Sequence, residues 1–202
     1  MQGLIGKKIG MTSVFDDAGN NIACTVVEAG PCVVTQVKTE ESDGYSAIQL
    51  GYGERKAKNT SKPLQGHFEK SKSTPKRKVV EFRNCELGKS LGEEVLVQDV
   101  FDEGDIVNAV GTSKGKGFQG VVKRHGFKGV NDATHGQHNR QRSPGSIGAA
   151  SYPAKVVKGL RMAGRTGGKR AKITNLEIVK IFPDKNILLV KGAIPGLSLI
   201  HI

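Results

Sequence analysis

The chain has 202 residues, of which 37% are hydrophobic and 25% charged, and its formal net charge at pH 7 is +12. This composition excludes full disorder, and the longest apolar runs, such as residues 187–190, fall far short of the roughly 20 residues that span a bilayer. The 3 cysteines include no C-x-x-C pair and residues 1–8 lack a secretory pattern, so we expect a soluble, cytoplasmic protein with reduced thiols.

Short strands separated by turn residues dominate most of the chain. Strands are predicted over 22–29 and 33–38, which alternate and are rich in valine, and in the same series over 45–52, 79–83, 93–97, 105–111, 173–182 and 187–192. Gly30-Pro31 and Asp43-Gly44 are turn signals, and Pro183–Asn186 predicts a hairpin. No long stretch has a helical period. The pattern therefore predicts a mainly β fold, an antiparallel barrel or sandwich.

Residues 54–78 interrupt this series as a basic insertion within the folded body. The insertion carries nine basic residues against Glu54 and Glu69, and residues 63–71 are compatible with a short helix. Such a segment is either a second surface that touches an anion or a basic surface loop without a partner. The sequence leaves both interpretations open.

Residues 113–172 contain the whole positive excess of the chain. They hold fourteen basic side chains and one acidic residue, Asp132, while the rest of the chain holds 17 basic and 18 acidic groups. The fourteen are Lys114, Lys116, Lys123, Arg124, Lys128, Arg140, Arg142, Lys155, Lys158, Arg161, Arg165, Lys169, Arg170 and Lys172. A concentrated excess of this kind indicates one polyanionic partner for one segment.

The same segment is poor in residues that build a core. It has twelve glycines and only nine Ile, Leu, Val or Phe residues, so apolar burial cannot offset the entropy of ordering it. Mutual repulsion of the cations adds to that cost, and a nucleic acid would relieve it. A solvated basic linker is the alternative, but regular strand sequence resumes at Ile173, so the segment leaves a folded body and returns. As a hairpin of ~30 residues a side it could reach at most ~100 Å.

Motifs for catalysis or cofactor binding are incomplete in this segment. Residues 115–120 match G-x-G-x-x-G, but the short helix predicted at Val121–His125 ends at Gly126, and no acidic residue follows at the spacing that binds a ribose. His125, His135 and His138 lack the further ligands of a zinc site, and base or phosphate contacts suit them better. We expect no cofactor, no metal and no catalytic residue. A phosphate- or nucleotide-handling enzyme and a DNA-compacting protein remain the rival hypotheses.

Six blocks in order along the chain closely resemble the universal large-subunit ribosomal protein L-three family. They are the residues GLIGKKIGMT at 3–12, NAVGTSKGKGFQGVVKR at 108–124, DATHG at 132–136, RSPGSIG at 142–148, KGLRMAG at 158–164 and LLVKGAIPG at 188–196. The resemblance covers essentially the whole chain in a bacterial-length form. An ordered set is far more specific than any single block.

The resemblance implies a β-barrel body formed by residues 1–112 and 173–202, with the small α+β insertion at 54–78. It further implies a long irregular loop, 113–172, that threads through large-subunit ribosomal RNA (rRNA) toward the peptidyl transferase centre. Family members bind this rRNA near its 3′ end, act early in subunit assembly and contact neighbouring ribosomal proteins, with no membrane or small-molecule substrate.

By the same resemblance, the loop tip is the region 143–153 and its stems are 113–128 and 155–172. Candidate rRNA contacts are the fourteen cations together with His135, His138, Ser143, Pro144, Gly145 and Ser146. Some bacterial members carry a methylated glutamine just after the S-I-G residues. Here Ala149, Ala150 and Ser151 occupy that region, so we expect no such modification.

Overall fold

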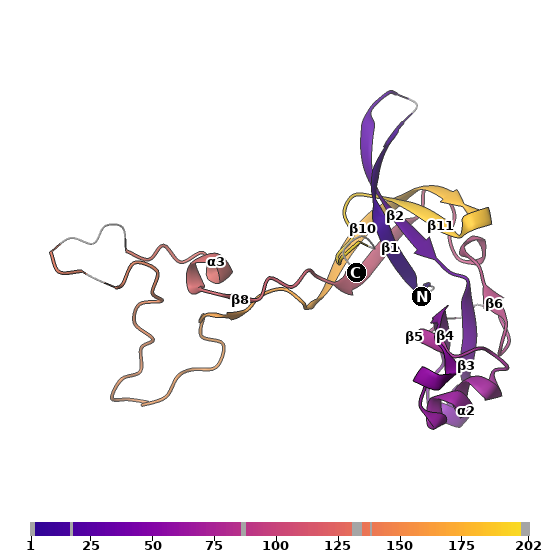
Figure 1. The fold of residues 1–202 in the computed structure, drawn as a ribbon, viewed down its shortest axis with the longest axis horizontal. Coiled ribbons are helices and arrows are strands. Elements are labelled where there is room, and N and C mark those ends of the chain that lie inside the picture. The colour runs from indigo at the N-terminus through magenta and orange to yellow at the C-terminus, as the bar shows by residue number, and fades with distance from the viewer. Residues whose placement is uncertain (1–2, 17, 86–87, 131–134, 138, 199–202) are drawn as a thin grey trace. The chain divides into compact units, whose positions relative to one another are not determined.

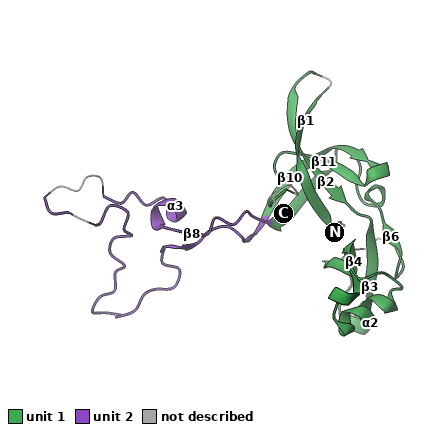
Figure 2. Cartoon of the chain, in the orientation of Figure 1, with its two compact units in different colours: residues 1–111, 172–202 green, residues 112–171 purple. Residues whose placement is uncertain are grey.

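The computed structural model describes residues 3–16, 18–85, 88–130, 135–137 and 139–198. The chain divides into two compact units, shown in different colours in Figure 2. Unit 1 comprises Met1–Gly111 and Lys172–Ile202, and unit 2 comprises Thr112–Ala171. Within the described ranges, no helix combines the length and the apolar composition needed to cross a membrane.

The larger sheet of unit 1, sheet A, has the strand order β1-β2-β11-β10-β7 (Figure 1). Its strands are β1 (Gly6–Phe15), β2 (Asn21–Ala29), β7 (Ile106–Thr112), β10 (Arg170–Phe182) and β11 (Ile187–Lys191). β2 pairs antiparallel with both β1 and β11. β10 and β11 form the predicted hairpin, which turns through the 3₁₀ helix η3 (Pro183–Lys185). Because β7 and β10 are neighbours, the chain between them leaves and rejoins the sheet at adjacent strands.

The smaller sheet, sheet B, has the order β5-β4-β3-β6, and the three pairs are antiparallel. Its strands are β3 (Cys32–Lys38), β4 (Ala47–Glu54), β5 (Lys76–Arg83) and β6 (Glu94–Val95), and α1 (Glu40–Asp43) links β3 to β4. The 3₁₀ helix η2 (Val97–Asp99) follows β6. The chain between β4 and β5 belongs to the basic insertion and contains the 3₁₀ helix η1 (Ala57–Asn59) and α2 (Lys62–Lys70).

Each sheet has its own apolar cluster, and this corrects the expectation of a closed barrel. Ile178, Leu188 and Val190 centre the cluster on sheet A, whereas Val34 and Leu50 centre the one on sheet B. Among the described residues of unit 1 the strands form two separate sheets and no closed barrel. Strand alternation predicts which face of a strand is buried but not which strand pairs next to it, so the pattern could not distinguish one closed sheet from two.

Helix α2 carries one buried side chain and makes one polar contact with sheet B. Phe68 is 2% exposed, and the neighbouring His67 places Nε2 2.7 Å from Oε1 of Gln49 on β4. Because an amide oxygen only accepts, the imidazole nitrogen is the donor. The predicted short helix at 63–71 is confirmed, with its ends one residue earlier.

Tyr52 of β4 gives the body a distinct sensitivity to alkali. Burial raises the pKa of its phenol from an ordinary value of 10.0 to about 12, and the negative charge of Glu28 acts in the same direction. The folded state therefore favours the neutral phenol, and its contribution to stability is complete below pH 10.0 and lost as the pH rises toward about 12.

We predict that the free energy of unfolding of the wild type falls more steeply over this pH interval than that of Tyr52→Phe, measured by urea denaturation at a series of pH values. The comparison with Tyr52→Phe removes the contribution of lysines and cysteines that titrate nearby. Parallel curves for the two proteins would contradict the assignment.

Candidate nucleic-acid interface

Unit 2 contains little regular structure (Figure 2). Its elements are β8 (Phe118–Gln119), α3 (Val121–His125) and β9 (Gly164–Arg165), together with the first residues of β10. The remaining described backbone forms turns and irregular segments. Functional side chains are therefore positioned by a small number of backbone contacts rather than by packing.

An out-and-back stem joins the two ends of unit 2. The Ser113 amide donates to the Lys169 carbonyl at 2.9 Å, and the Gly168 amide donates to the Ser113 carbonyl at 3.1 Å. Farther along, the Lys116 amide donates to the Thr166 carbonyl at 2.9 Å, and β8 pairs antiparallel with β9. The stem thereby brings Lys114 and Lys116 beside the returning segment that carries Arg165 and Lys169.

This stem requires glycine at position 167. Gly167 has φ +71°, and a Cβ there would collide with the Lys114 carbonyl oxygen on the opposite strand. Gly168 has a similar φ of +63°, but a Cβ there would meet only the Arg165 side chain, at 3.9 Å. Sequence reasoning did not identify these positions individually, although the Gly167-Gly168 doublet was a visible signal.

The short helix α3 is held to the backbone at Met162 by its last two side chains. Nη1 of Arg124 donates to the Met162 carbonyl at 2.7 Å, and Nε2 of His125 lies 3.1 Å from the same oxygen. A side chain at Gly164 would collide with the Arg124 guanidinium, so glycine provides the room for it. Arg124 is thus partly committed to the structure of unit 2, and it is half-buried while the other cations are exposed.

Thirteen of the fourteen cations of the segment are exposed, and none of the fourteen has an acidic partner among the described residues. The exposed ones are Lys114, Lys116, Lys123, Lys128, Arg140, Arg142, Lys155, Lys158, Arg161, Arg165, Lys169, Arg170 and Lys172. Salt bridges between described residues number four, and none includes a cation of this segment. The positive charge that the sequence predicted is therefore presented to solvent without internal compensation in the part of the chain that the structure describes.

Apolar burial is almost absent from unit 2. Val121, 2% exposed, is its sole buried hydrophobic residue among those described. Phe118 and Tyr152 are 76% and 92% exposed. Both rings are open to solvent, and bases of a single-stranded nucleic acid can stack on such rings.

The expected tip residues lie on irregular, exposed backbone. The Ser143 hydroxyl donates to the Arg140 carbonyl at 3.0 Å, and Gly145 has φ +80°, as a tight reversal requires. Pro144 and Ser146 are exposed, and the Ser146 hydroxyl accepts from the Gly148 amide at 3.2 Å.

Among the described residues, the histidines and the glycine motif do not come together as a metal or dinucleotide site. His135 is exposed and His125 is bound to the Met162 carbonyl, whereas His138 and Asp132 lie outside the described residues. In the described chain no His, Cys, Asp and Glu side chains gather into a group that could hold a metal ion. The G-x-G-x-x-G residues precede a helix of 5 residues, and β8 pairs antiparallel with β9, so the βαβ unit of a dinucleotide site is not formed there.

Comparisons with known proteins agree with a nucleic-acid-associated role. The family model described as "Ribosomal protein L3" matches residues 77–187. The chain is 61% identical over 194 residues to the large ribosomal subunit protein uL3 of Salinibacter ruber, a match that covers 96% of this chain and 93% of the relative.

The contrast between Gly167 and Gly168 gives a matched pair of variants. Both Gly167→Ala and Gly168→Ala place alanine at positive φ, which costs roughly 1–2 kcal/mol, but only the former adds a clash with the backbone of the opposite strand. We predict that Gly167→Ala weakens RNA binding by about tenfold or more and that Gly168→Ala has a clearly smaller effect, measured by filter binding. Equal affinities for the two variants would show that the stem contact at Lys114 does not matter for binding.

Proposed function

Because the chain belongs to the ribosomal protein L3 family, we propose that the segment 113–172 binds ribosomal RNA of the large subunit. Membership of this family makes the protein a structural constituent of the large ribosomal subunit and not an enzyme. The nucleotide-handling enzyme that residues 115–120 left open is thereby removed.

The unpaired charge of unit 2 is the observation that supports RNA as the partner. Within the described ranges its cations have no acidic partner, and one buried hydrophobic residue, Val121, cannot compensate for their repulsion. A polyanion with phosphates at regular intervals neutralises such a segment along its whole length and releases counterions as it does so. The same partner supplies unpaired bases for Phe118 and Tyr152.

Different residues of the segment have different roles in this proposal. Lysines and arginines contact phosphates, which fixes the position of the chain on the RNA without reading its sequence. Glycines let the backbone approach RNA closely because they carry no side chain. The Gly167-Gly168 doublet shows the same property within the protein, where Gly167 lies close to the backbone of Lys114. The hydrogen bonds of Arg124 and His125 to Met162 fix the position of α3 within unit 2. A fixed α3 in turn orients Lys123 and Lys128.

We further propose where and when the protein acts. It binds large-subunit rRNA near the 3′ end, joins the subunit early in assembly, contacts neighbouring ribosomal proteins through its body, and directs the tip region 143–153 toward the peptidyl transferase centre of cytoplasmic ribosomes. The ordered sequence blocks that resemble the family support this part of the proposal, and the exposed reversal at Gly145 is compatible with a tip.

Salt dependence tests the electrostatic basis of the proposal. If roughly 6–10 cations contact phosphates, the affinity for an rRNA transcript falls about 10³–10⁵-fold between 50 and 200 mM salt. We assign one phosphate contact to each of Lys155 and Lys158, so replacing both with alanine lowers the magnitude of the log–log slope by about 2. Lys180→Ala with Lys185→Ala, on exposed positions of the body, is the control and leaves the slope unchanged. An affinity independent of salt would contradict the proposal.

Specificity for the subunit requires a second experiment. Binding to an rRNA transcript is compared with binding to duplex DNA at matched salt, and the protein is tested for co-sedimentation with large subunits through a salt wash. We expect preference for the transcript and retention on the subunit. Equal affinity for DNA would instead favour a general DNA-compacting protein.

A further inference from the structure

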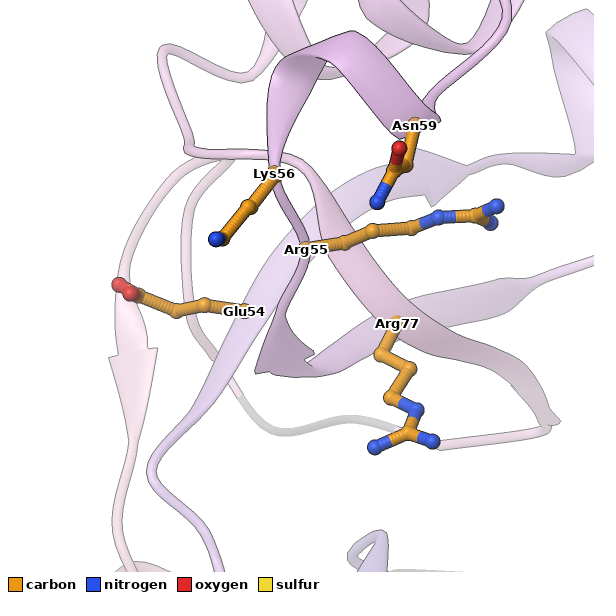
Figure 3. A pocket seen from close by; sticks show the side chains of 5 residues that line it. All are labelled: Glu54, Arg55, Lys56, Asn59 and Arg77. Atoms are coloured by element: carbon orange, nitrogen blue, oxygen red, sulfur yellow. The ribbon is translucent and has the colours of Figure 1, made fainter.

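A second group of cations lies on the folded body, outside unit 2, and forms no salt bridge with the described residues. A surface pocket at the open end of the β4–β5 pair is lined by Glu54, Arg55, Lys56, Asn59 and Arg77 (Figure 3). The proposed role of the segment 113–172 does not use these residues. They belong to the basic insertion for which the sequence left two interpretations open.

The backbone around this pocket fixes where each side chain starts. Glu54 of β4 is opposite Lys76 of β5, and Tyr52 is opposite Lys78, which puts Arg77 across from Gly53. The Arg55 amide donates to the Pro75 carbonyl at 2.9 Å and closes the end of the pair. Because these contacts exist before a ligand binds, binding costs little conformational entropy of the main chain.

η1 positions the two other polar groups of the pocket. The Asn59 amide donates to the Lys56 carbonyl at 2.9 Å, which holds both residues on one turn. Figure 3 shows the Asn59 side chain pointing toward the Arg55 side chain. Both side chains line the pocket.

The electrostatics of the pocket favour an anion. Arg55, Lys56 and Arg77 are exposed, and none of them takes part in the salt bridges found among the described residues. Glu54 is the single carboxylate in the lining, and Figure 3 shows it pointing away from the guanidinium groups of Arg55 and Arg77. The positive charges are thus open to an external partner.

The composition of the lining favours nucleic acid over a protein as that partner. Every side chain that lines the pocket is charged or an amide, whereas the centre of a protein–protein interface is enriched in apolar and aromatic residues. Guanidinium groups bind phosphate through paired hydrogen bonds, and an asparagine amide donates to phosphate or sugar oxygens. The pocket matches the chemistry of an RNA backbone.

We propose that Arg55, Lys56, Asn59 and Arg77 form a second RNA-backbone site, held on the folded body and separate in sequence from the segment 113–172. This inference rests on the proposed function, because RNA is the partner at both sites. Two sites on one chain bind one RNA with an avidity that neither site has alone, provided that the RNA reaches both.

The test uses the full-length triple variant Arg55→Ala/Lys56→Ala/Arg77→Ala and a transcript of the 3′ region of large-subunit rRNA. We expect the magnitude of the log–log salt slope to fall by about 2–3, one unit for each lost phosphate contact. Because the three side chains are exposed, the thermal unfolding midpoint should stay unchanged, which separates a loss of contacts from a loss of folding.

Two control variants make the result specific. Lys58→Ala/Lys62→Ala/Lys70→Ala removes the same charge from exposed positions of the insertion that do not line the pocket, and it should change the slope by less than half as much. Arg55→Lys/Arg77→Lys keeps the charge but loses the paired hydrogen bonds, so it should weaken binding while leaving the slope nearly intact.

The possible outcomes separate this site from the main proposal. A triple variant that binds the transcript with the wild-type slope, or a control with an equal loss, overturns the pocket as a site and leaves the role of the segment 113–172 standing. Absence of salt-dependent RNA binding by the wild type itself overturns the proposed function, and this inference with it.

Discussion

Mutual repulsion among the cations of residues 113–172 is the constraint on which the rest of the molecule depends. Like charges along one segment oppose compaction, and apolar burial is the usual compensation. In unit 2 that compensation is limited to Val121 among the described residues. Backbone pairing at Ser113 and Lys116 and the contacts to Met162 define a path for the chain, but they contribute little against the entropy of ordering it.

The folded body supplies the stability that the segment lacks. Two sheets with separate apolar clusters bury Leu50, Ile178 and Leu188, and the segment begins and ends on the neighbouring strands β7 and β10 of sheet A. The body also carries unpaired cations beside η1, within the insertion between β4 and β5. A folded body and a segment with little apolar burial therefore share one chain, and positive charge is available on both.

Most strands were predictable because they are short runs rich in apolar residues between turn residues, as in β2, β3 and β11, while other features left no local signal. β1 was missed because Gly6, Lys7, Lys8 and Gly10 obscure its alternation, and its pairing with β2 stabilises it. The separation into two sheets depends on strand pairing, which alternation does not encode. Similarly, the sequence gives Arg124 as one cation among fourteen, and only the fold reveals its bond to the Met162 carbonyl. Residue-level RNA contacts remain predictions.

Hydrogen–deuterium exchange of the full-length protein, with and without the rRNA transcript at moderate ionic strength, tests the central claim most directly. The informative amides are those of Lys116, Thr166 and Gly168, which are hydrogen-bonded across the stem, and amides of β2 and β11 provide the internal reference. The account predicts fast exchange across the stem in the free protein and slow exchange in the complex, with β2 and β11 slow in both. Slow exchange across the stem in RNA-free protein would contradict it.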